Sequence, residues 1–298
     1  MIKAVIPVAG LGTRLLSATK GQPKEMLPIF SKDNGTLCLK PMVQLIFENL
    51  FEFGIRDFYF VVGKGKRAIE DQFTADSNFT RLHGNGNTTQ TLMLEAFHKM
   101  IRASTIVWVN QQEPRGFGDA VLQVESLVGK KSFLVVAGDT YLSSESYNIH
   151  SQITQFHEMG QAEATLTLKE VNDPKHYGVA EAVGLIDDRH LAVQRVIEKP
   201  EFPTSRLAIM PLYVFNARIF TALRDTNPGK NGEIQLTDAI QKLIDMGHKI
   251  QAIKLRAEDT HLDIGTPETY WNALRLSYER ASKKEITETS EPYVNSYT

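Results

Sequence analysis

The stretch KAVIPVAGLGTR, residues 3–14, indicates the fold class, because it joins a buried strand to a glycine-rich turn. The apolar run from Lys3 to Val8 has strand length, and Gly10 and Gly12 break it. Glycines directly after a buried strand let backbone N–H groups approach phosphate oxygens, since no Cβ blocks the way. The alternative is a tight turn without a ligand. A dinucleotide-binding turn lacks its third glycine here, because position 15 is Leu, and the Walker pattern is absent too.

Strands and helices alternate over the first half of the chain. Helical spacing of apolar residues over 42–53 ends at Gly54, which suits a helix C-terminus. Further predicted strands cover 57–62, 104–109 and 132–137, and further predicted helices cover 67–73 and 120–127. This alternation predicts an α/β fold with a Rossmann-like, mostly parallel (mixed) sheet flanked by helices.

The second half has longer strand patterns and two helices. Predicted strands cover 162–168, 192–197 and 207–215, and extend the sheet or build a lobe over its edge. One predicted helix covers 236–246 with Thr237 as a cap, and another covers 267–282 with Pro267 in its first turn. Residues 85–90 read as an exposed loop, and 283–298 as a flexible polar tail. We therefore expect a single domain over residues 1–282.

Composition excludes several classes of protein. The 298 residues carry 33 basic and 35 acidic side chains, a formal net charge of -2, so no basic field points to nucleic acid. No apolar run approaches the roughly 18 residues of a membrane span, and the N-terminus does not resemble a signal peptide. The single cysteine, Cys38, suits a reducing compartment. We expect a cytoplasmic protein with no nucleic-acid or membrane partner.

Basic and acidic residues follow the predicted strands. Arg14, Lys20 and Lys24 lie on the loop after the first strand, at the edge where open α/β sheets bind ligands. Such a cluster suits a triphosphate, although solvated surface lysines are the alternative. Asp139 follows the strand 132–137, where its carboxylate could hold a hard cation, and Asp263 could supply a second oxygen ligand. The alternatives are a turn aspartate at 139 and a helix cap at 263.

Several motifs together resemble the sugar-nucleotide pyrophosphorylases. The first two are GLGTR at 10–14 and PKEMLP at 23–28, and the glutamate of the second is similar to the uridylyltransferase branch of that family. Five more follow in the family's order: QQEPRGFGDA at 111–120, GD at 138–139, YGV at 177–179, EKP at 198–200 and GEIQLTDAI at 232–240. The resemblance covers nearly the whole chain.

The resemblance implies a nucleotidyltransferase (glycosyltransferase-A-like) fold and transfer of a uridylyl group from UTP to glucose 1-phosphate with Mg²⁺. It implies a nucleotide-binding part of about 1–140, a sugar-binding part of about 141–265, and a homo-oligomer, dimer or tetramer. The implied catalytic residues are Arg14, Lys24, Asp139 and Lys199. The implied nucleotide-binding residues are Ala9, Gly10, Gly12, Thr13, Arg14, Lys24, Glu25, Gln111 and Gly116. The implied sugar-phosphate residues are Gly178, Glu198 and Lys199, and the implied metal ligands are Asp139 and Asp263.

The predicted sugar site has a physical requirement of its own. A carboxylate at 198 can accept hydrogen bonds from sugar hydroxyls, and an ammonium at 199 can hold a phosphate. Successive residues of a strand face opposite ways, so Glu198 and Lys199 serve one ligand only if the chain bends, which Pro200 favours. A surface ion pair is the alternative. Other readings of the whole chain are the same chemistry with dTTP or another sugar phosphate, a catalytically silent regulatory paralogue, and a nicotinamide-dependent oxidoreductase.

Overall fold

A single mixed sheet runs through the molecule, and its strand order is β5-β4-β1-β6-β11-β8-β12-β10-β9. The computed structural model describes residues 2–75, 88–184, 187–229 and 232–283. The strands are β1 (Lys3–Pro7), β4 (Asp57–Val62), β5 (Thr105–Asn110), β6 (Phe133–Val136), β8 (Ala164–Glu170), β9 (Gly178–Gly184), β10 (His190–Glu198), β11 (Leu207–Phe215) and β12 (Ile250–Lys254). The predicted tail falls almost wholly outside the described residues, which end at Lys283.

The sheet is parallel at one end and largely antiparallel at the other. β1 pairs in parallel with β4 and β6, and β4 with β5. β11 runs antiparallel to both β6 and β8, and β10 antiparallel to both β12 and β9. Consequently the carboxyl ends of β5, β4, β1 and β6 meet at one edge, and the loops after them lie side by side.

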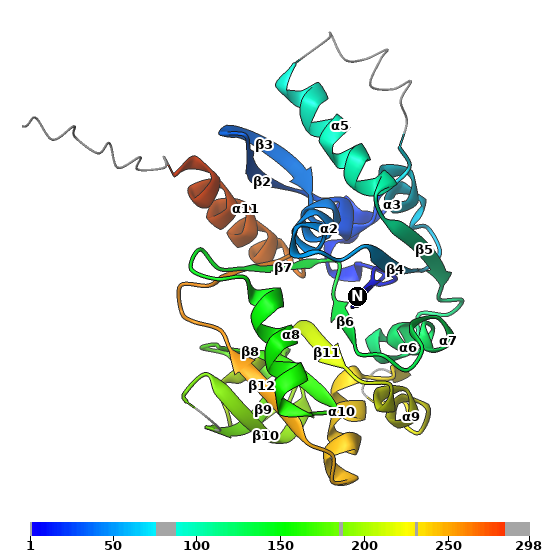
Figure 1. The fold of residues 1–298 in the computed structure, drawn as a ribbon, viewed down its shortest axis with the longest axis vertical. Coiled ribbons are helices and arrows are strands. Elements are labelled where there is room, and N and C mark those ends of the chain that lie inside the picture. Colours follow the sequence, from blue (N-terminus) through cyan, green and yellow to red (C-terminus); the bar gives the residue numbers. More distant parts are fainter. Residues whose placement is uncertain (1, 76–87, 185–186, 230–231, 284–298) are drawn as a thin grey trace, which may run out of the picture.

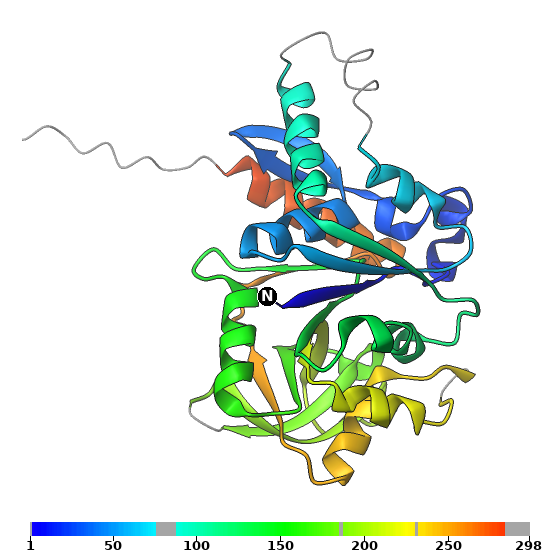
Figure 2. The same ribbon diagram turned by 45° about the vertical axis from the view of Figure 1, so that its right-hand side comes forward.

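Helices cover both faces of the sheet, and each face has its own apolar core (Figures 1 and 2). The first core packs against α2 (Met42–Phe53), α3 (Arg67–Gln72), α5 (Thr89–Arg102) and α8 (Ile149–Gly160). The second packs against α6 (Phe117–Leu122), α7 (Glu125–Val128), α9 (Arg218–Arg224) and α10 (Leu236–Asp245). None of the described helices has the length and apolar character needed to cross a membrane.

Smaller elements complete the fold near the parallel end. The hairpin β2 (Pro28–Asp33) and β3 (Thr36–Pro41) packs against the C-terminal helix α11 (Pro267–Ser282). A second small sheet pairs β7 (Thr140–Ser143) with β13 (Thr260–Asp263). The short helices are η1 (Thr13–Leu15), α1 (Leu16–Thr19), η2 (Lys24–Met26) and η3 (Pro174–His176).

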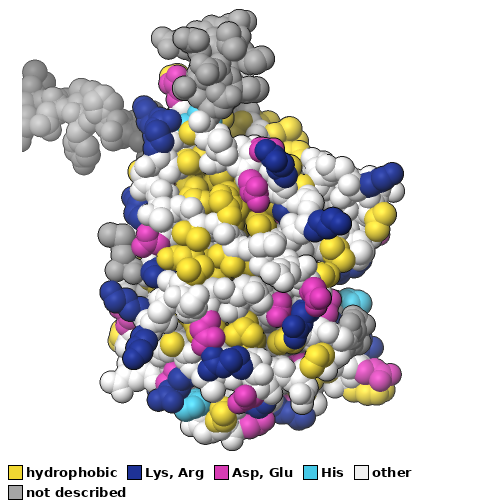
Figure 3. Space-filling model, turned by 90° about the vertical axis from the view of Figure 1, so that its right-hand side faces the viewer, with side chains coloured by type: hydrophobic (Ala, Val, Ile, Leu, Met, Phe, Trp, Pro, Cys, Tyr) yellow, Lys and Arg dark blue, Asp and Glu magenta, His cyan; other side chains and the backbone are white. Residues whose placement is uncertain are grey.

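Strand β5 forms the exposed edge of the parallel half. Figure 3 looks onto this side of the molecule, where hydrophobic side chains gather in the upper half of the face. Trp108 of β5 stacks on Phe60 of β4, with ring centroids 4.9 Å apart, so the edge strand is anchored by aromatic packing.

The predicted α/β fold is confirmed, with several corrections to its elements. The segment predicted as one helix over 120–127 is split into α6 and α7. Residues 85–87 of the predicted loop lie outside the described residues, while Thr89 and Gln90 begin α5, capped by the Thr88 side chain. Thr237 is not a helix cap, because Gln235 occupies that position. Asp263 is not a cap either, since Thr266 accepts the N-terminal hydrogen bond of α11.

Candidate functional site

The loops after β1, β4, β5 and β6 converge at one edge of the sheet and carry most of the predicted nucleotide-binding residues. The loop after β1 contains Ala9, Gly10, Gly12 and Thr13. A Cβ on Gly63, after β4, would lie 3.1 Å from the Ala9 carbonyl oxygen, so these two loops are in close contact. The parallel topology thus gathers short segments that are far apart in the sequence.

The glycine-rich loop is held in shape by a threonine from its own far end. The Thr19 hydroxyl donates to the carbonyl oxygens of Gly12 and Leu15, each at 2.9 Å. The loop therefore closes on itself through η1 and α1, and Arg14 lies exposed on its surface. Arg14 is close enough to Asp263 for its charge to act on that carboxyl group.

Lys24, Asp139 and Asp263 meet beside this loop. The Lys24 ammonium donates to Asp139 Oδ2. The backbone pairing of β7 with β13 sets Asp263 opposite Thr140, and the Ile264 N–H donates to the Asp139 carbonyl at 3.0 Å. The Thr140 hydroxyl lies 3.2 Å from Asp139 Oδ1 and 3.5 Å from Asp263 Oδ1. The two predicted metal ligands are thereby neighbours, although 124 positions separate them in the sequence.

The charges of this cluster shift one another's titration. Burial acts to raise the pKa of Asp139, but the Lys24 ammonium outweighs it, and the pKa is lowered. Burial and then the Asp139 carboxylate raise the pKa of Asp263. Burial acts to lower the pKa of Lys24, but Asp139 and Glu25 outweigh it and the pKa is raised. Lys24 and Asp139 therefore stay charged together around neutral pH.

Asp139 and Asp263 are placed so that they could hold a divalent cation between them. Asp139 and Asp263 supply carboxylate oxygens, the ligands that Mg²⁺ prefers. Over the described residues, no group of three or more His, Cys, Asp or Glu side chains gathers as a metal site. Mg²⁺ often binds through one or two carboxylates plus phosphate oxygens and water, so a pair of aspartates is consistent with it.

Glu25 lies in a buried ion pair behind Lys24. Its side chain is 2% exposed, and its Oε2 accepts from Lys66 Nζ at 2.8 Å. Burial raises the pKa of Glu25, although Lys66 and Lys24 oppose that rise. Lys66 lies in the loop after β4, so this pair ties the loops after β1 and β4 together.

The predicted base-recognition loop packs against the GEIQLTDAI segment. The Gly118 N–H donates to the Ile234 carbonyl at 2.9 Å, and the Ile234 N–H donates to the Arg115 carbonyl at 2.8 Å. Gly116 has a φ of 106°, and a Cβ there would lie 2.8 Å from the Ile234 oxygen. Only glycine fits both the conformation and the contact. The 232–240 motif is thus the structural support of the loop at 111–120.

Gln111 is buried beneath that loop. Its side-chain nitrogen Nε2 donates to the Gly116 carbonyl at 3.1 Å and to Asp119 Oδ2 at 2.7 Å. Gln111 and Asp119 are each only 4% exposed. The predicted base-contacting side chain is therefore locked in orientation.

Gly178, Glu198 and Lys199 come together at the antiparallel end of the site. Lys199 adopts a left-handed conformation, with φ at 40°, which turns its side chain back to Glu198. Lys199 Nζ lies 2.8 Å from Glu198 Oε1, and the Thr237 hydroxyl donates to Glu198 Oε2 at 2.7 Å. A Cβ on Gly178 would lie 2.8 Å from that hydroxyl. The bend needed for residues 198 and 199 to face one ligand is present.

Tyr177 contacts this group through its backbone. The Lys199 N–H donates to the Tyr177 carbonyl at 3.0 Å. Burial, and then the negative charge of Asp263, raise the pKa of the Tyr177 phenol. The Tyr177 phenol therefore lies within electrostatic range of Asp263.

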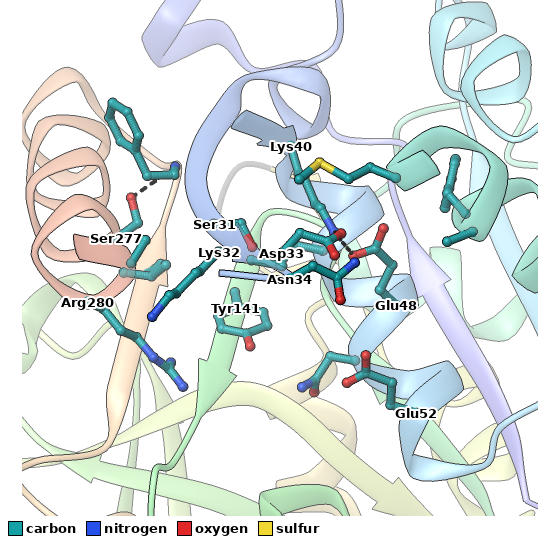
Figure 4. A pocket seen from close by; sticks show the side chains of 18 of the residues that line it. Ser31, Lys32, Asp33, Asn34, Lys40, Glu48, Glu52, Tyr141, Ser277 and Arg280 are labelled. Atoms are coloured by element: carbon teal, nitrogen blue, oxygen red, sulfur yellow. Dashed lines mark hydrogen bonds and ion pairs between the residues drawn. The ribbon is translucent and has the colours of Figure 1, made fainter. Parts of the chain in front are cut away.

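A separate cavity of about 960 Å³ lies between the β2–β3 hairpin, α2, α5, β7 and α11 (Figure 4). Polar groups line it, including Lys40, which pairs with Glu48 at 2.7 Å and with Asp33 at 2.9 Å. None of the predicted site residues lines this cavity. The convergence of charged groups at the sheet edge, not cavity size, identifies the candidate site.

Three residues of the site were not assigned a role from the sequence: Lys66, Asp119 and Thr237. Lys66 lies at the carboxyl end of β4, and that position alone could have identified it. Asp119 lies within the 111–120 motif, and the position of Thr237 at the start of a predicted helix indicates a cap instead of a site residue. Their partners are distant in the sequence or depend on side-chain orientation, so no local pattern points to these roles.

Comparison with known proteins agrees with this architecture. The nucleotidyl transferase family model matches residues 3–279. The UTP–glucose-1-phosphate uridylyltransferase of Bacillus subtilis is 38% identical over 244 residues, covering 81% of this chain and 80% of that protein. The protein of the same name from Pseudomonas aeruginosa is 34% identical over 286 residues, covering 94% and 97%.

Solved structures show the same similarity. A UDP-glucose pyrophosphorylase complexed with UDP-glucose superposes with a TM-score of 0.81 at 30% identity, covering 94% of this chain and 100% of that one. The UDP-glucose pyrophosphorylase from Acinetobacter baumannii gives a TM-score of 0.79 at 28% identity, covering 95% of each chain. The chain therefore belongs to the nucleotidyl transferase family, in the group of the UTP–glucose-1-phosphate uridylyltransferases.

Proposed function

We propose that this protein transfers the uridylyl group of UTP to glucose 1-phosphate, forming UDP-glucose and releasing pyrophosphate. The observation that carries the proposal is the presence of two clusters of charged residues, one beside the glycine-rich loop and one at the end of β10. One is Lys24 with the paired aspartates Asp139 and Asp263. The other is the Glu198–Lys199 pair, whose backbone is hydrogen-bonded to Tyr177, and the Tyr177 phenol lies within electrostatic range of Asp263.

The reaction is a direct in-line displacement. A phosphate oxygen of glucose 1-phosphate attacks the α-phosphorus of UTP, and the bond from that phosphorus to the bridging oxygen of pyrophosphate breaks. Attacking and leaving groups are phosphates that are already ionised at neutral pH, so the reaction needs no general base and no protein nucleophile. Positioning and neutralisation of charge carry the catalysis.

The nucleotide half of the site follows from the loops after the parallel strands. Arg14 and Lys24 neutralise the triphosphate, and the backbone of Ala9, Gly10, Gly12 and Thr13 approaches the nucleotide, with Glu25 behind it. Asp139 and Asp263 would hold Mg²⁺, which neutralises phosphate charge when bound. Gln111 and Gly116 face the base. The support is that these residues share one edge of the sheet and that Lys24 already contacts Asp139.

The sugar half follows from β9 and β10. Lys199 holds the phosphate of glucose 1-phosphate as a point charge, and Glu198 accepts hydrogen bonds from sugar hydroxyls. Gly178 allows the ligand to approach the backbone.

We further propose a nucleotide-binding part of about 1–140, a sugar-binding part of about 141–265, and a cytoplasmic homo-oligomer. Apolar side chains exposed on β3 and α11, such as Leu39 and Trp271, are consistent with contacts between copies.

The test is a matrix of nucleoside triphosphates against sugar 1-phosphates, with and without Mg²⁺, scored by pyrophosphate release. We expect the highest kcat/KM for UTP with glucose 1-phosphate and no turnover once the metal is chelated. A higher kcat/KM for dTTP, or for another sugar phosphate, would replace the substrate pair while leaving the reaction class intact. Absence of pyrophosphate release from every pair would refute the proposed function.

A further inference from the structure

We propose that Asp119 determines base specificity: it fixes the orientation of the Gln111 amide so that the site accepts uracil and rejects cytosine. This inference rests on the proposed function, because it takes Gln111 to face the base of the nucleotide. Asp119 does not contact the substrate in this proposal. It determines whether the Gln111 amide presents its oxygen or its nitrogen to the base.

The orientation follows from two acceptors that flank one end of the amide. Gln111 Nε2 lies 3.1 Å from the Gly116 carbonyl oxygen and 2.7 Å from Asp119 Oδ2. A carbonyl and an ionised carboxylate can only accept hydrogen bonds. If the amide turned over, its oxygen would face both acceptors and lose both hydrogen bonds. The NH₂ end therefore points to Asp119 and Gly116.

The consequence is that the amide presents its oxygen to a base. The NH₂ group has two hydrogens, and its two partners use both. Oε1 is then the end of the side chain that can meet a base, and it only accepts. Uracil and thymine carry an N3–H donor on the matching edge, whereas N3 of cytosine is an acceptor. Cytosine would place two lone pairs against each other in a buried site, which is costly.

Asp119 is positioned by the helix that carries it. It lies in the first turn of α6, and the side-chain amide of Gln123 lies 3.4 Å from its Oδ2. The start of α6 is fixed in turn by the hydrogen bond from Gly118 to Ile234. A rigid partner is what a specificity device requires, because a mobile carboxylate would let the amide adapt to either base.

The experiment compares nucleotide selectivity in Asp119→Asn and wild type. An asparagine can either accept from the Gln111 nitrogen or donate to its oxygen, so only the longer hydrogen bond to the Gly116 carbonyl still opposes turning of the amide. We expect the ratio of kcat/KM for UTP to that for CTP to fall by about 10-fold or more, since a buried polar mismatch costs on that order. The ratio for UTP against dTTP should not change, because both bases carry N3–H. Glu113→Gln also removes one negative charge from the same loop, but at an exposed side chain. This control should leave both ratios at wild-type values.

The outcomes separate this inference from the proposed function. A UTP/CTP ratio in folded Asp119→Asn within twofold of wild type would overturn the inference. A parallel shift of the UTP/dTTP ratio would also overturn it, because it would indicate general damage to the loop. Asp119→Ala is a second variant, in case Asp119→Asn does not fold. The inference requires that at least one of these two variants shows both a lowered UTP/CTP ratio and a thermal unfolding transition like that of wild type. A wild-type enzyme that releases no pyrophosphate from UTP and glucose 1-phosphate would overturn the proposed function as well.

Discussion

Replacing Lys66 with methionine would leave Glu25 as a buried carboxylate without its closest cation. The pair is nearly inaccessible to solvent: the side chains of Lys66 and Glu25 are 7% and 2% exposed, and Nζ lies 2.8 Å from Oε2. Methionine keeps much of the length and apolar stem of lysine, so the change removes the charge with little loss of packing. The variant therefore isolates the ion pair.

The expected loss can be worked from the geometry. Two unit charges 2.8 Å apart attract by about 6 kcal/mol at an effective dielectric constant of about 20. Removing one partner of a buried pair typically costs about 3–5 kcal/mol of unfolding free energy. The positive charge of Lys24 also stabilises the Glu25 carboxylate and remains in the variant, so the loss should lie at the lower end of this range. We expect Lys66→Met to lose about 3 kcal/mol at pH 8.

The loss should depend on pH in a defined direction. Burial already raises the pKa of Glu25, and removal of Lys66 raises it further. An acid whose pKa is higher in the folded state than in the unfolded state binds more protons when folded, so the stability of the variant falls as pH rises. The deficit relative to wild type should thus be larger at pH 8 than at pH 5.

Urea denaturation followed by tryptophan fluorescence would measure this, with two variants as controls. Glu25→Gln combined with Lys66→Met removes both charges and should recover most of the loss. Lys64→Met changes an exposed lysine in the same loop and should cost less than about 0.5 kcal/mol. A loss below about 1 kcal/mol for Lys66→Met, or no recovery in the double variant, would refute the reasoning.

Three further predictions concern the chemistry. Asp139→Asn should lower kcat by roughly 10³-fold in a Mg²⁺ titration with an unchanged circular dichroism spectrum, and near-normal activity would remove Asp139 from the metal site. Lys199→Ala should raise the KM for glucose 1-phosphate about 10-fold or more in steady-state assays; a change confined to the UTP dependence would contradict its role. Thr237→Val should raise the same KM about 5–10-fold because Glu198 loses its hydroxyl partner, whereas Thr237→Ser should not. Equal effects of the valine and serine variants would argue against that hydrogen bond.

Helices and strands whose boundaries or apolar pattern lie in a few adjacent residues were predictable from the sequence. Helix 42–53 ends where Gly54 allows a left-handed C-cap, with φ at 109°, and helix 267–282 begins at the proline that suits a first turn. Strands 57–62 and 207–215 are apolar runs with no competing helical period. In each case a few adjacent residues contain the whole signal.

Other elements needed the folded chain. β7 and β13 have four residues each, too few for a periodic pattern, and they form a sheet only because each meets the other. α5 begins within a polar stretch that reads as a loop, and its packing against α2 stabilises the helix. Short or polar elements take their stability from tertiary contacts, which a local window does not contain.

From the sequence by itself, the resemblance of its motifs to the sugar-nucleotide pyrophosphorylases predicted the reaction class, and the placement of residues after strands predicted the edge of the sheet that carries it. Glycines and charged residues placed directly after apolar strands must emerge at the carboxyl edge of a parallel sheet, so Arg14, Lys24 and Asp139 could be assigned to one site. Only the tertiary structure decided the pairings within that site: Glu25 with Lys66, and Gln111 with Asp119. The first pair joins two loops of the sheet edge, and the second depends on how a side chain turns beneath its own loop. These contacts depend on the order of the strands in the sheet and on side-chain rotamers, and the local sequence pattern predicts neither.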